Sequence, residues 1–392
     1  MNSFEFHCPT KIVCGKNALR KLPQILEESN VTKPLLVTDA NLLALGVCEH
    51  AIAPLEENGI AFAQFSDVPP DSSLDVVNRV ANLYKEAGCD GFIALGGGSV
   101  IDTTKGAAAS IAMDGKEFEK LQGAEIITCD LDPIIAVPTT AGTGSEVTLV
   151  AVVKDQEAHA KLSFTSYKLV PHVAVIDPQL TTSLPARLTA TTGIDALTHA
   201  VEAYTSVQKN PVSDAFAHEA IRLISQNLIE CCQNGKNADA RCELALGSLM
   251  AGASFSNAMV GIVHALGHSL GGLCGIPHGQ AMMLLLPHCV RWNLDHGYHT
   301  GLYGQLLGDL RPDKASRGLT PRQADEAFCS ELFAQNEFLN RSFGVPITLK
   351  ELGVTTDQLA DVARQARYDG SALYNCQEFS LEEAQEILEA AF

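Results

Sequence analysis

Gly91-Phe-Ile-Ala-Leu-Gly-Gly-Gly-Ser-Val-Ile-Asp102 joins a short apolar run to three glycines and then to a segment with a helical pattern. The run Gly91–Leu95 predicts a buried strand. Glycines after a strand let backbone N–H groups approach a pyrophosphate closely, and the helix that follows adds the positive end of its dipole. Ser99 adds a hydroxyl donor. We therefore predict a strand–loop–helix unit in an open α/β sheet, with a nucleotide at the loop.

The glycine loop departs from the usual dinucleotide fingerprint. It does not match G-x-G-x-x-G, and no acidic residue is evident about 20 residues downstream. A triple glycine can also serve only as a tight turn. Two other loops favour a nucleotide. Pro138–Glu146 follows another strand-like run and carries three threonines, and Asp39 ends the run Pro34–Thr38. A carboxylate there would accept hydrogen bonds from a ribose and repel a 2′-phosphate, which favours NAD over NADP, although Asp39 alone is equally typical of a helix cap.

The first and second halves of the chain differ in pattern. Short apolar runs alternate with helical segments in the first half, at Pro34–Thr38, Gly91–Leu95, Pro133–Val137 and Val173–Ile176. This rhythm predicts crossover units and a mainly parallel sheet. Strand-like runs nearly vanish after about residue 188, and helix-capping signatures such as Thr320-Pro-Arg-Gln323 replace them. We predict an α/β domain over residues 1–182 and an all-helical domain over residues 183–392.

The second half holds a set of residues that could bind a metal ion. Asp195 and His199 are four residues apart, so a helix would place them on one face, one turn apart. His264 can approach from another helix, and glycine and proline breaks after it would let the chain fold back to present His278. Such a pair usually makes a surface hydrogen bond or a cap. However, Cys242–Val290 contains no Lys or Arg, and imidazoles in an apolar segment need partners. One carboxylate and three imidazoles suit a divalent ion such as Fe²⁺ or Zn²⁺.

Composition excludes several classes of protein. The chain has 392 residues, is 46% hydrophobic and carries a net charge of −19 without any basic cluster, so nucleic acids and anionic membranes are poor partners. We see no signal peptide, and the longest apolar stretches are too short to span a bilayer. The twelve cysteines are scattered and form no CxxC motif, which favours reduced thiols in a cytoplasm.

Together these motifs resemble the iron-containing (group III) alcohol dehydrogenase family, which is related in architecture to glycerol dehydrogenases and dehydroquinate synthase. The resemblance covers nearly the full length. It is carried by five motifs in order: Gly96–Asp102, Pro138–Glu146, Gly193–Glu202, Phe255–Gly279 and Leu286-Pro-His288. The fold that it implies is an N-terminal Rossmann-like nucleotide-binding domain and a C-terminal helical, metal-binding domain.

The resemblance also implies roles for individual residues. The metal ligands would be Asp195, His199, His264 and His278. His268 would lie near the nicotinamide and take part in proton transfer, or it could instead support a ligand by a hydrogen bond. The cofactor site would comprise Asp39, Gly97, Gly98, Ser99, Thr139, Thr140, Thr143, Lys161 and Leu180. Lys161 by itself is equally typical of a surface lysine.

The function implied is NAD(H)- and metal-dependent interconversion of small primary alcohols and aldehydes, in which the metal polarises the alkoxide or carbonyl oxygen. The family uses Fe²⁺, and the ligand set also accepts Zn²⁺ or Mn²⁺. A homodimer or higher homo-oligomer is expected. The chain departs from the family pattern at Asn375-Cys-Gln-Glu378, where many members have Asn-Pro-Arg, and at Leu149-Val150, where some relatives carry a polar residue.

Three alternatives remain open. The first is a reductase of a small anionic aldehyde, sulfonated or phosphonated, for which Arg187, Arg367 or a loop would supply the cation. The second is a lyase of the dehydroquinate synthase type, against which the cation-free stretch Cys242–Val290 argues. The third is a catalytically silent nucleotide- or metal-binding protein.

Overall fold

The computed structural model describes residues 3–115, 118–156, 160–314 and 318–392. Its contacts divide the chain into two compact units, His7–Ser183 and Leu184–Phe392, and residues 3–6 group with the second. The predicted division at residues 182 and 183 stays a prediction. Residues 3–6 contact the helical unit through Phe6, which stacks on Phe216 with ring centroids 5.5 Å apart.

A parallel sheet forms the centre of the first unit, as the sequence predicted. Its six strands run in the order β1-β9-β6-β4-β2-β3, and every pairing is parallel. The strands are β1 (Lys11–Cys14), β2 (Pro34–Val37), β3 (Ala63–Phe65), β4 (Gly91–Gly96), β6 (Ile134–Pro138) and β9 (Val173–Ile176). All four predicted runs are strands. The edge strands β1 and β3 were missed because β1 is largely exposed and β3 has only three residues.

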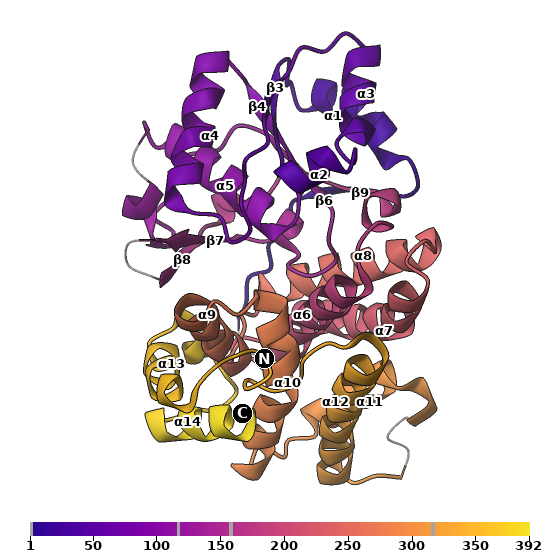
Figure 1. Ribbon diagram of the computed structural model, residues 1–392, viewed down its shortest axis with the longest axis vertical. Helices are drawn as coiled ribbons and strands as arrows, with labels where there is room; N and C mark the ends of the chain where they lie inside the picture. Colours follow the sequence, from indigo (N-terminus) through magenta and orange to yellow (C-terminus); the bar gives the residue numbers. More distant parts are fainter. Residues whose placement is uncertain (1–2, 116–117, 157–159, 315–317) are drawn as a thin grey trace. The chain divides into compact units, whose positions relative to one another are not determined.

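Helices cover both faces of this sheet. They are α1 (Leu22–Glu28), α2 (Ala40–Ala44), α3 (Glu49–Glu57), α4 (Leu74–Ala87) and α5 (Gly98–Ala112). Figure 1 shows α4 and α5 on one side of the strands and α1 and α3 on the other. Consecutive strand residues enter opposite cores: Phe92 packs with α4 and α5, whereas Ile93 packs with α1 and α3. Both faces are therefore buried, which explains why these strands are apolar throughout.

A second, three-stranded sheet lies in the same unit. It comprises β5 (Gly123–Ala124), β8 (Ala160–Thr165) and β7 (Val150–Asp155), and β7 and β8 pair antiparallel. Short 3₁₀ turns connect these elements at Ala18–Lys21, Phe118–Leu121, Ser145–Val147, Tyr167–Leu169 and Pro178–Thr181. The sequence patterns did not predict this sheet.

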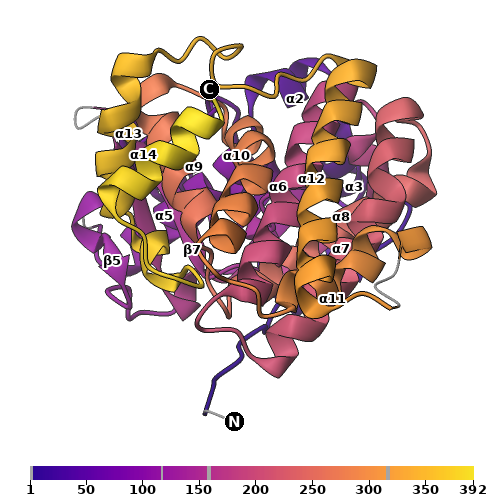
Figure 2. The ribbon, with the colours of Figure 1, turned by 90° about the horizontal axis from the view of Figure 1, so that it is seen from below.

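The second unit is helical throughout its described residues. Its helices are α6 (Ala186–Thr205), α7 (Pro211–Gln233), α8 (Ala238–Phe255), α9 (Ile262–Cys274), α10 (His278–Asp295), α11 (Leu302–Leu310), α12 (Pro321–Phe343), α13 (Leu359–Arg367) and α14 (Leu381–Ala390), with 3₁₀ turns at Pro312–Lys314, Thr356–Gln358 and Gly370–Tyr374. Figure 2 shows α6 enclosed by its neighbours, and it packs against α7, α8, α10 and α12. The Thr320 hydroxyl and Gln323 side chain form the predicted capping box. No described helix is both long and apolar enough to cross a membrane.

A buried lysine ties α5 to β7. Lys105 is fully buried, and its Nζ donates to the carbonyl oxygens of Thr148 and Val150, each at 2.9 Å. Asp102, also on α5, accepts hydrogen bonds from the Ser145 hydroxyl (2.5 Å) and from a backbone N–H of β7. Burial lowers the pKa of Lys105 to about 8, against the attraction of Asp102 and Glu146. These bonds join α5, the helix after the glycine loop, to β7 and Thr148. Both follow the threonine-rich loop Pro138–Glu146 in the chain.

We predict that Lys105→Met lowers the stability of the first unit by about 2–4 kcal/mol, since it leaves buried acceptors unsatisfied and Asp102 without its neighbouring cation. Hydrogen exchange read by mass spectrometry should show lost protection in α5 and β7. Lys16→Met, at an exposed position, is the control. Unchanged protection in Lys105→Met would contradict the role assigned to the ammonium.

Candidate metal centre

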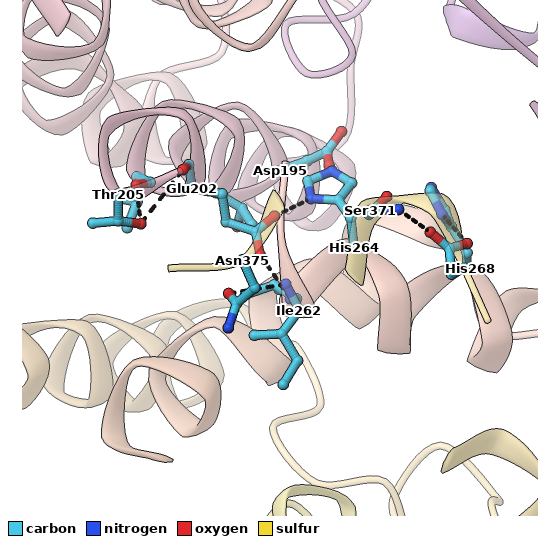
Figure 3. Close-up of polar contacts among 12 residues, drawn as sticks. Asp195, Glu202, Thr205, Ile262, His264, His268, Ser371 and Asn375 are labelled. Atoms are coloured by element: carbon cyan, nitrogen blue, oxygen red, sulfur yellow. Dashed lines mark hydrogen bonds and ion pairs between the residues drawn. The ribbon is translucent and has the colours of Figure 1, made fainter. Parts of the chain in front are cut away.

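Four side chains from three helices converge in the helical unit. Asp195 and His199 lie one turn apart on α6, His264 lies on α9, and His278 is the first residue of α10. One possible ligand atom from each residue lies within 4.8 Å of all the others. Asp195, His199 and His264 are buried, and His278 is partly exposed. The structure therefore brings together all four residues that the sequence predicted as metal ligands. Figure 3 shows Asp195 beside His264.

Two glycines after α9 explain how His278 reaches this cluster. Gly275 ends α9 in the left-handed region (φ 70°), which reverses the chain at low steric cost. Gly279 lies so close to α6 that a Cβ atom would be 2.8 Å from the carbonyl oxygen of Thr191. The start of α10 can thus approach α6, and His278 Nε2 lies 3.3 Å from Asp195 Oδ1.

The cluster fits a divalent cation. His264 Nε2 and Asp195 Oδ1 are buried and make no hydrogen bond to any described residue. A buried polar atom without a hydrogen bond costs about 1–3 kcal/mol, and a cation among the four groups would satisfy both atoms. Burial and the nearby imidazoles of His278 and His268 lower the pKa of His264 well below its ordinary value. The ring is therefore neutral, as a ligand must be.

Glu202 holds the other nitrogen of His264. Its Oε2 lies 2.5 Å from His264 Nδ1 (Figure 3). Its Oε1 accepts the backbone N–H of Val263 at 2.7 Å. Burial raises the pKa of Glu202 to about 7, against the backbone N–H groups that bind it. With the proton of His264 on Nδ1, the lone pair of Nε2 faces the cluster. The sequence reasoning missed Glu202, although Asp195, His199 and Glu202 share one helical face.

His268 borders the cluster without being one of its four members. Its ring centroid lies 5.8 Å from that of His264 and 5.6 Å from that of His278. Its Nδ1 lies 3.0 Å from Oδ2 of Asp369, the residue before the turn Gly370–Tyr374. His268 therefore lies beside His264 and His278; its place near the nicotinamide and its role in proton transfer stay predictions.

In the first unit, two of the three predicted nucleotide loops touch: the glycine loop and the threonine-rich loop Pro138–Glu146. Gly97 is the N-cap of α5. Because β4 and β6 pair in parallel, both loops begin at the carboxyl ends of neighbouring strands. A Cβ on Gly98 would lie 2.6 Å from the Thr143 methyl, and one on Gly97 would lie 3.4 Å from the Thr140 hydroxyl. Ser99 lies in the first turn of α5, and Thr139 donates its backbone N–H to Gly96. A side chain at Gly98 would therefore collide with the facing loop, whereas one at Gly97 would make an ordinary contact.

The remaining predicted cofactor residues differ in their surroundings. Asp39 caps α2: its Oδ1 accepts the N–H groups of Asn41 and Leu42, both at 2.9 Å, which uses one of its two oxygens. Lys161 is largely buried and pairs with Asp71 at 2.9 Å. The Leu180 side chain is buried in an apolar core of the sheet. A contact from Leu180 to a cofactor would have to come from its backbone.

Comparison with known proteins agrees with both units. The family model "Iron-containing alcohol dehydrogenase" matches residues 9–178, and the model of the C-terminal part of that family matches residues 189–392. The chain belongs to the iron-containing alcohol dehydrogenase family. It is 37% identical to a 1,3-propanediol dehydrogenase of Klebsiella pneumoniae, over 99% of both chains. The enzymes of this family use NAD(H) and a divalent metal.

Solved structures of the family match over the full length. A crystal structure of 1,3-propanediol oxidoreductase has a TM-score of 0.93 and 36% identity, with 100% of both chains covered. A sulfoacetaldehyde reductase from Bifidobacterium kashiwanohense, solved in complex with NAD⁺, has a TM-score of 0.85 and 27% identity, with 100% of this chain and 99% of that one covered. The predicted fold class and family are confirmed, and the chain is an oxidoreductase of alcohols and aldehydes.

We predict that Glu202→Gln weakens metal binding about 10–100-fold. The Val263 N–H can only donate, so it keeps the amide oxygen, and the amide NH₂ then faces His264 Nδ1. The ring proton would move to Nε2 and block the lone pair. Competition titration with a chelator measures the affinity, and Glu219→Gln on α7 is the control. Equal affinities in Glu202→Gln and the parent protein would contradict the assigned role.

We also predict that Gly98→Ala weakens NAD(H) binding at least tenfold, because the new methyl would force the two loops apart, while the metal content stays unchanged. Adding Thr143→Ser removes the methyl that the alanine meets and should restore part of the affinity. Calorimetry with NADH measures both variants. No loss in Gly98→Ala, or no recovery in the double variant, would show that the contact between the loops does not matter.

Proposed function

We propose that the chain is an NAD(H)-dependent, divalent-metal-dependent dehydrogenase that interconverts small, neutral primary alcohols and aldehydes. The observation that supports this most is the buried cluster of Asp195, His199, His264 and His278, in which two polar atoms make no hydrogen bond to a described residue. Such a donor set accepts Fe²⁺, and also Zn²⁺ or Mn²⁺. The glycine loop at the N-terminus of α5 supplies a site for the pyrophosphate of NAD(H).

The reaction is a two-electron transfer. In oxidation, the alcohol loses a hydride from its carbon to C4 of the nicotinamide and a proton from its hydroxyl, so that R–CH₂OH and NAD⁺ give R–CHO, NADH and H⁺. A divalent cation bound by the four residues supplies a Lewis acid for the substrate oxygen. His268 is proposed to take up the hydroxyl proton, and Asp39, through its remaining carboxylate oxygen, to bind the adenosine ribose and disfavour NADP.

Charge around the cluster supports a neutral substrate. Asp195, Glu202 and Asp369 lie at or beside the ligands, and the ion-pair partners of all three are imidazoles. The stretch Cys242–Val290, which supplies α9 and most of α10, has no Lys or Arg. These carboxylates would repel a sulfonate or phosphonate. The resemblance to a sulfoacetaldehyde reductase keeps an anionic aldehyde as the second candidate.

A lyase of the dehydroquinate synthase type is the third candidate. It would have to hold a carboxylated, phosphorylated substrate, and the same lack of cations disfavours it. A lyase regenerates its cofactor in each turnover, so net consumption of NADH separates the two reactions.

We further propose a cytoplasmic enzyme that acts as a homodimer or higher homo-oligomer. No disulfide joins any of the twelve cysteines, all of which lie in the described residues, and this agrees with a reducing compartment. The proposed oligomer rests on the family resemblance, and sedimentation of the purified protein tests it.

The test is an assay of the purified chain with short-chain aldehydes after chelation and anaerobic reconstitution with Fe²⁺, Zn²⁺ or Mn²⁺. We expect aldehyde-dependent oxidation of NADH that is lost on chelation, is restored by metal and is faster with NADH than with NADPH. Full activity after chelation would refute the metal dependence. A kcat/KM at least tenfold higher for sulfoacetaldehyde than for neutral aldehydes, about 1.4 kcal/mol of transition-state preference, would refute the neutral substrate.

A further inference from the structure

The two histidines of α9 share one arrangement. His264 and His268 lie one turn apart, and each presents its Nδ1 to a carboxylate from a different element: Glu202 on α6 and Asp369 after α13. Figure 3 shows His264 between Glu202 and His268. Only His264 belongs to the four-residue cluster. A carboxylate thus lies at the Nδ1 of both histidines, although only His264 is a candidate metal ligand.

Asp369 receives two hydrogen bonds of different kinds. Its Oδ1 accepts the backbone N–H of Ser371 at 2.8 Å, and its Oδ2 lies 3.0 Å from His268 Nδ1. Burial raises the pKa of Asp369, but the attraction of His268 when its ring is charged and the hydrogen bonds from His268 and Ser371 outweigh burial and lower this pKa. The hydrogen bonds remain when the ring is neutral. The group is therefore an anion, which accepts through both oxygens and donates through neither.

This geometry decides which nitrogen of His268 carries the proton. A backbone N–H can only donate, so Ser371 fixes the orientation of the carboxylate. Because Oδ2 carries no proton, Nδ1 of His268 must be the donor. In the neutral ring, Nε2 then has a free lone pair. Asp369 caps the turn Gly370–Tyr374 with Oδ1 alone. Capping therefore does not explain the bond between Oδ2 and His268.

We propose that Asp369 is a positioning residue that holds His268 in the Nδ1–H tautomer and so keeps its Nε2 ready to exchange a proton with the substrate. In alcohol oxidation, the O–H bond breaks and an Nε2–H bond forms, while the hydride goes to NAD⁺ as above. The proton then passes to water, and aldehyde reduction runs in reverse. The inference rests on the proposed function, and it gives Asp369 no part in holding the metal.

The first test is Asp369→Asn. The Ser371 N–H would keep the one amide oxygen, the NH₂ group would face Nδ1, and the ring proton would move to Nε2. Nitrogen-15 NMR of protein labelled at histidine reports the tautomer directly, with His268 assigned from a His268→Gln sample. We expect a pyridine-type Nε2 in the parent protein and a protonated Nε2 in the variant. Protonated Nε2 in the parent protein, or an unchanged tautomer in Asp369→Asn, would overturn the inference.

Kinetics give the second test. We expect kcat of Asp369→Asn to fall roughly 10²–10⁴-fold, the range for losing a proton-transfer group, with the metal content and the KM for NADH unchanged. Asp361→Asn, exposed on α13 and paired with Arg364, is the control and should retain full activity. Loss of metal in Asp369→Asn would instead make Asp369 part of the metal support and refute the proposal.

A double-mutant cycle separates this inference from the function on which it rests. If Asp369 acts through His268, the variant His268→Gln/Asp369→Asn should be no slower than His268→Gln, within about twofold. Multiplying losses would mean that Asp369 acts independently, which refutes the inference. If His268→Gln retained the parent kcat, proton transfer through His268 would be wrong for this enzyme, and so would the use proposed for the tautomer.

Discussion

Four polar side chains, three of them buried, meet in the helical unit, and the site that we propose depends on their sharing one cation. Without a cation, Asp195 Oδ1 and His264 Nε2 are buried without a hydrogen bond to a described residue. With one, each gains a strong interaction. Natural proteins rarely leave such atoms unsatisfied, so these two atoms support a bound cation.

Carboxylates around the cluster decide what each imidazole can do. Glu202 and Asp369 each take a backbone N–H with one oxygen and a ring Nδ1 with the other. In both cases a backbone N–H fixes the orientation of the carboxylate. The carboxylate then favours the tautomer of the ring that carries its proton on Nδ1. In the proposed site, one histidine of α9 binds the cation and the next exchanges a proton. This division of labour follows from where two carboxylates lie, since the two rings are chemically identical.

Features that leave a local pattern in the sequence, such as a continuous apolar run or a helical spacing, were predicted well. The strands Pro34–Val37 and Gly91–Gly96 were found because burial on both faces makes them apolar throughout. Asp195 and His199 were paired because a helix imposes a spacing of four. The edge strand Lys11–Cys14 was missed, since one exposed side removes the apolar signal. The three-stranded sheet was also missed, because its strands are short or mixed in polarity and one of them has two residues.

By itself, the sequence determined the two-part architecture, the four candidate ligands and the glycine loop, because local spacing and composition indicate each of them. Contacts between segments far apart in the chain belong to the tertiary structure alone. It placed Lys105 against Thr148 and Val150, and Asp39 at a helix cap. It also placed Glu202 and Asp369 beside two histidines 62 and 101 residues away. A carboxylate at such a separation leaves no periodic trace, since nothing but the packing of helices decides which ring it meets.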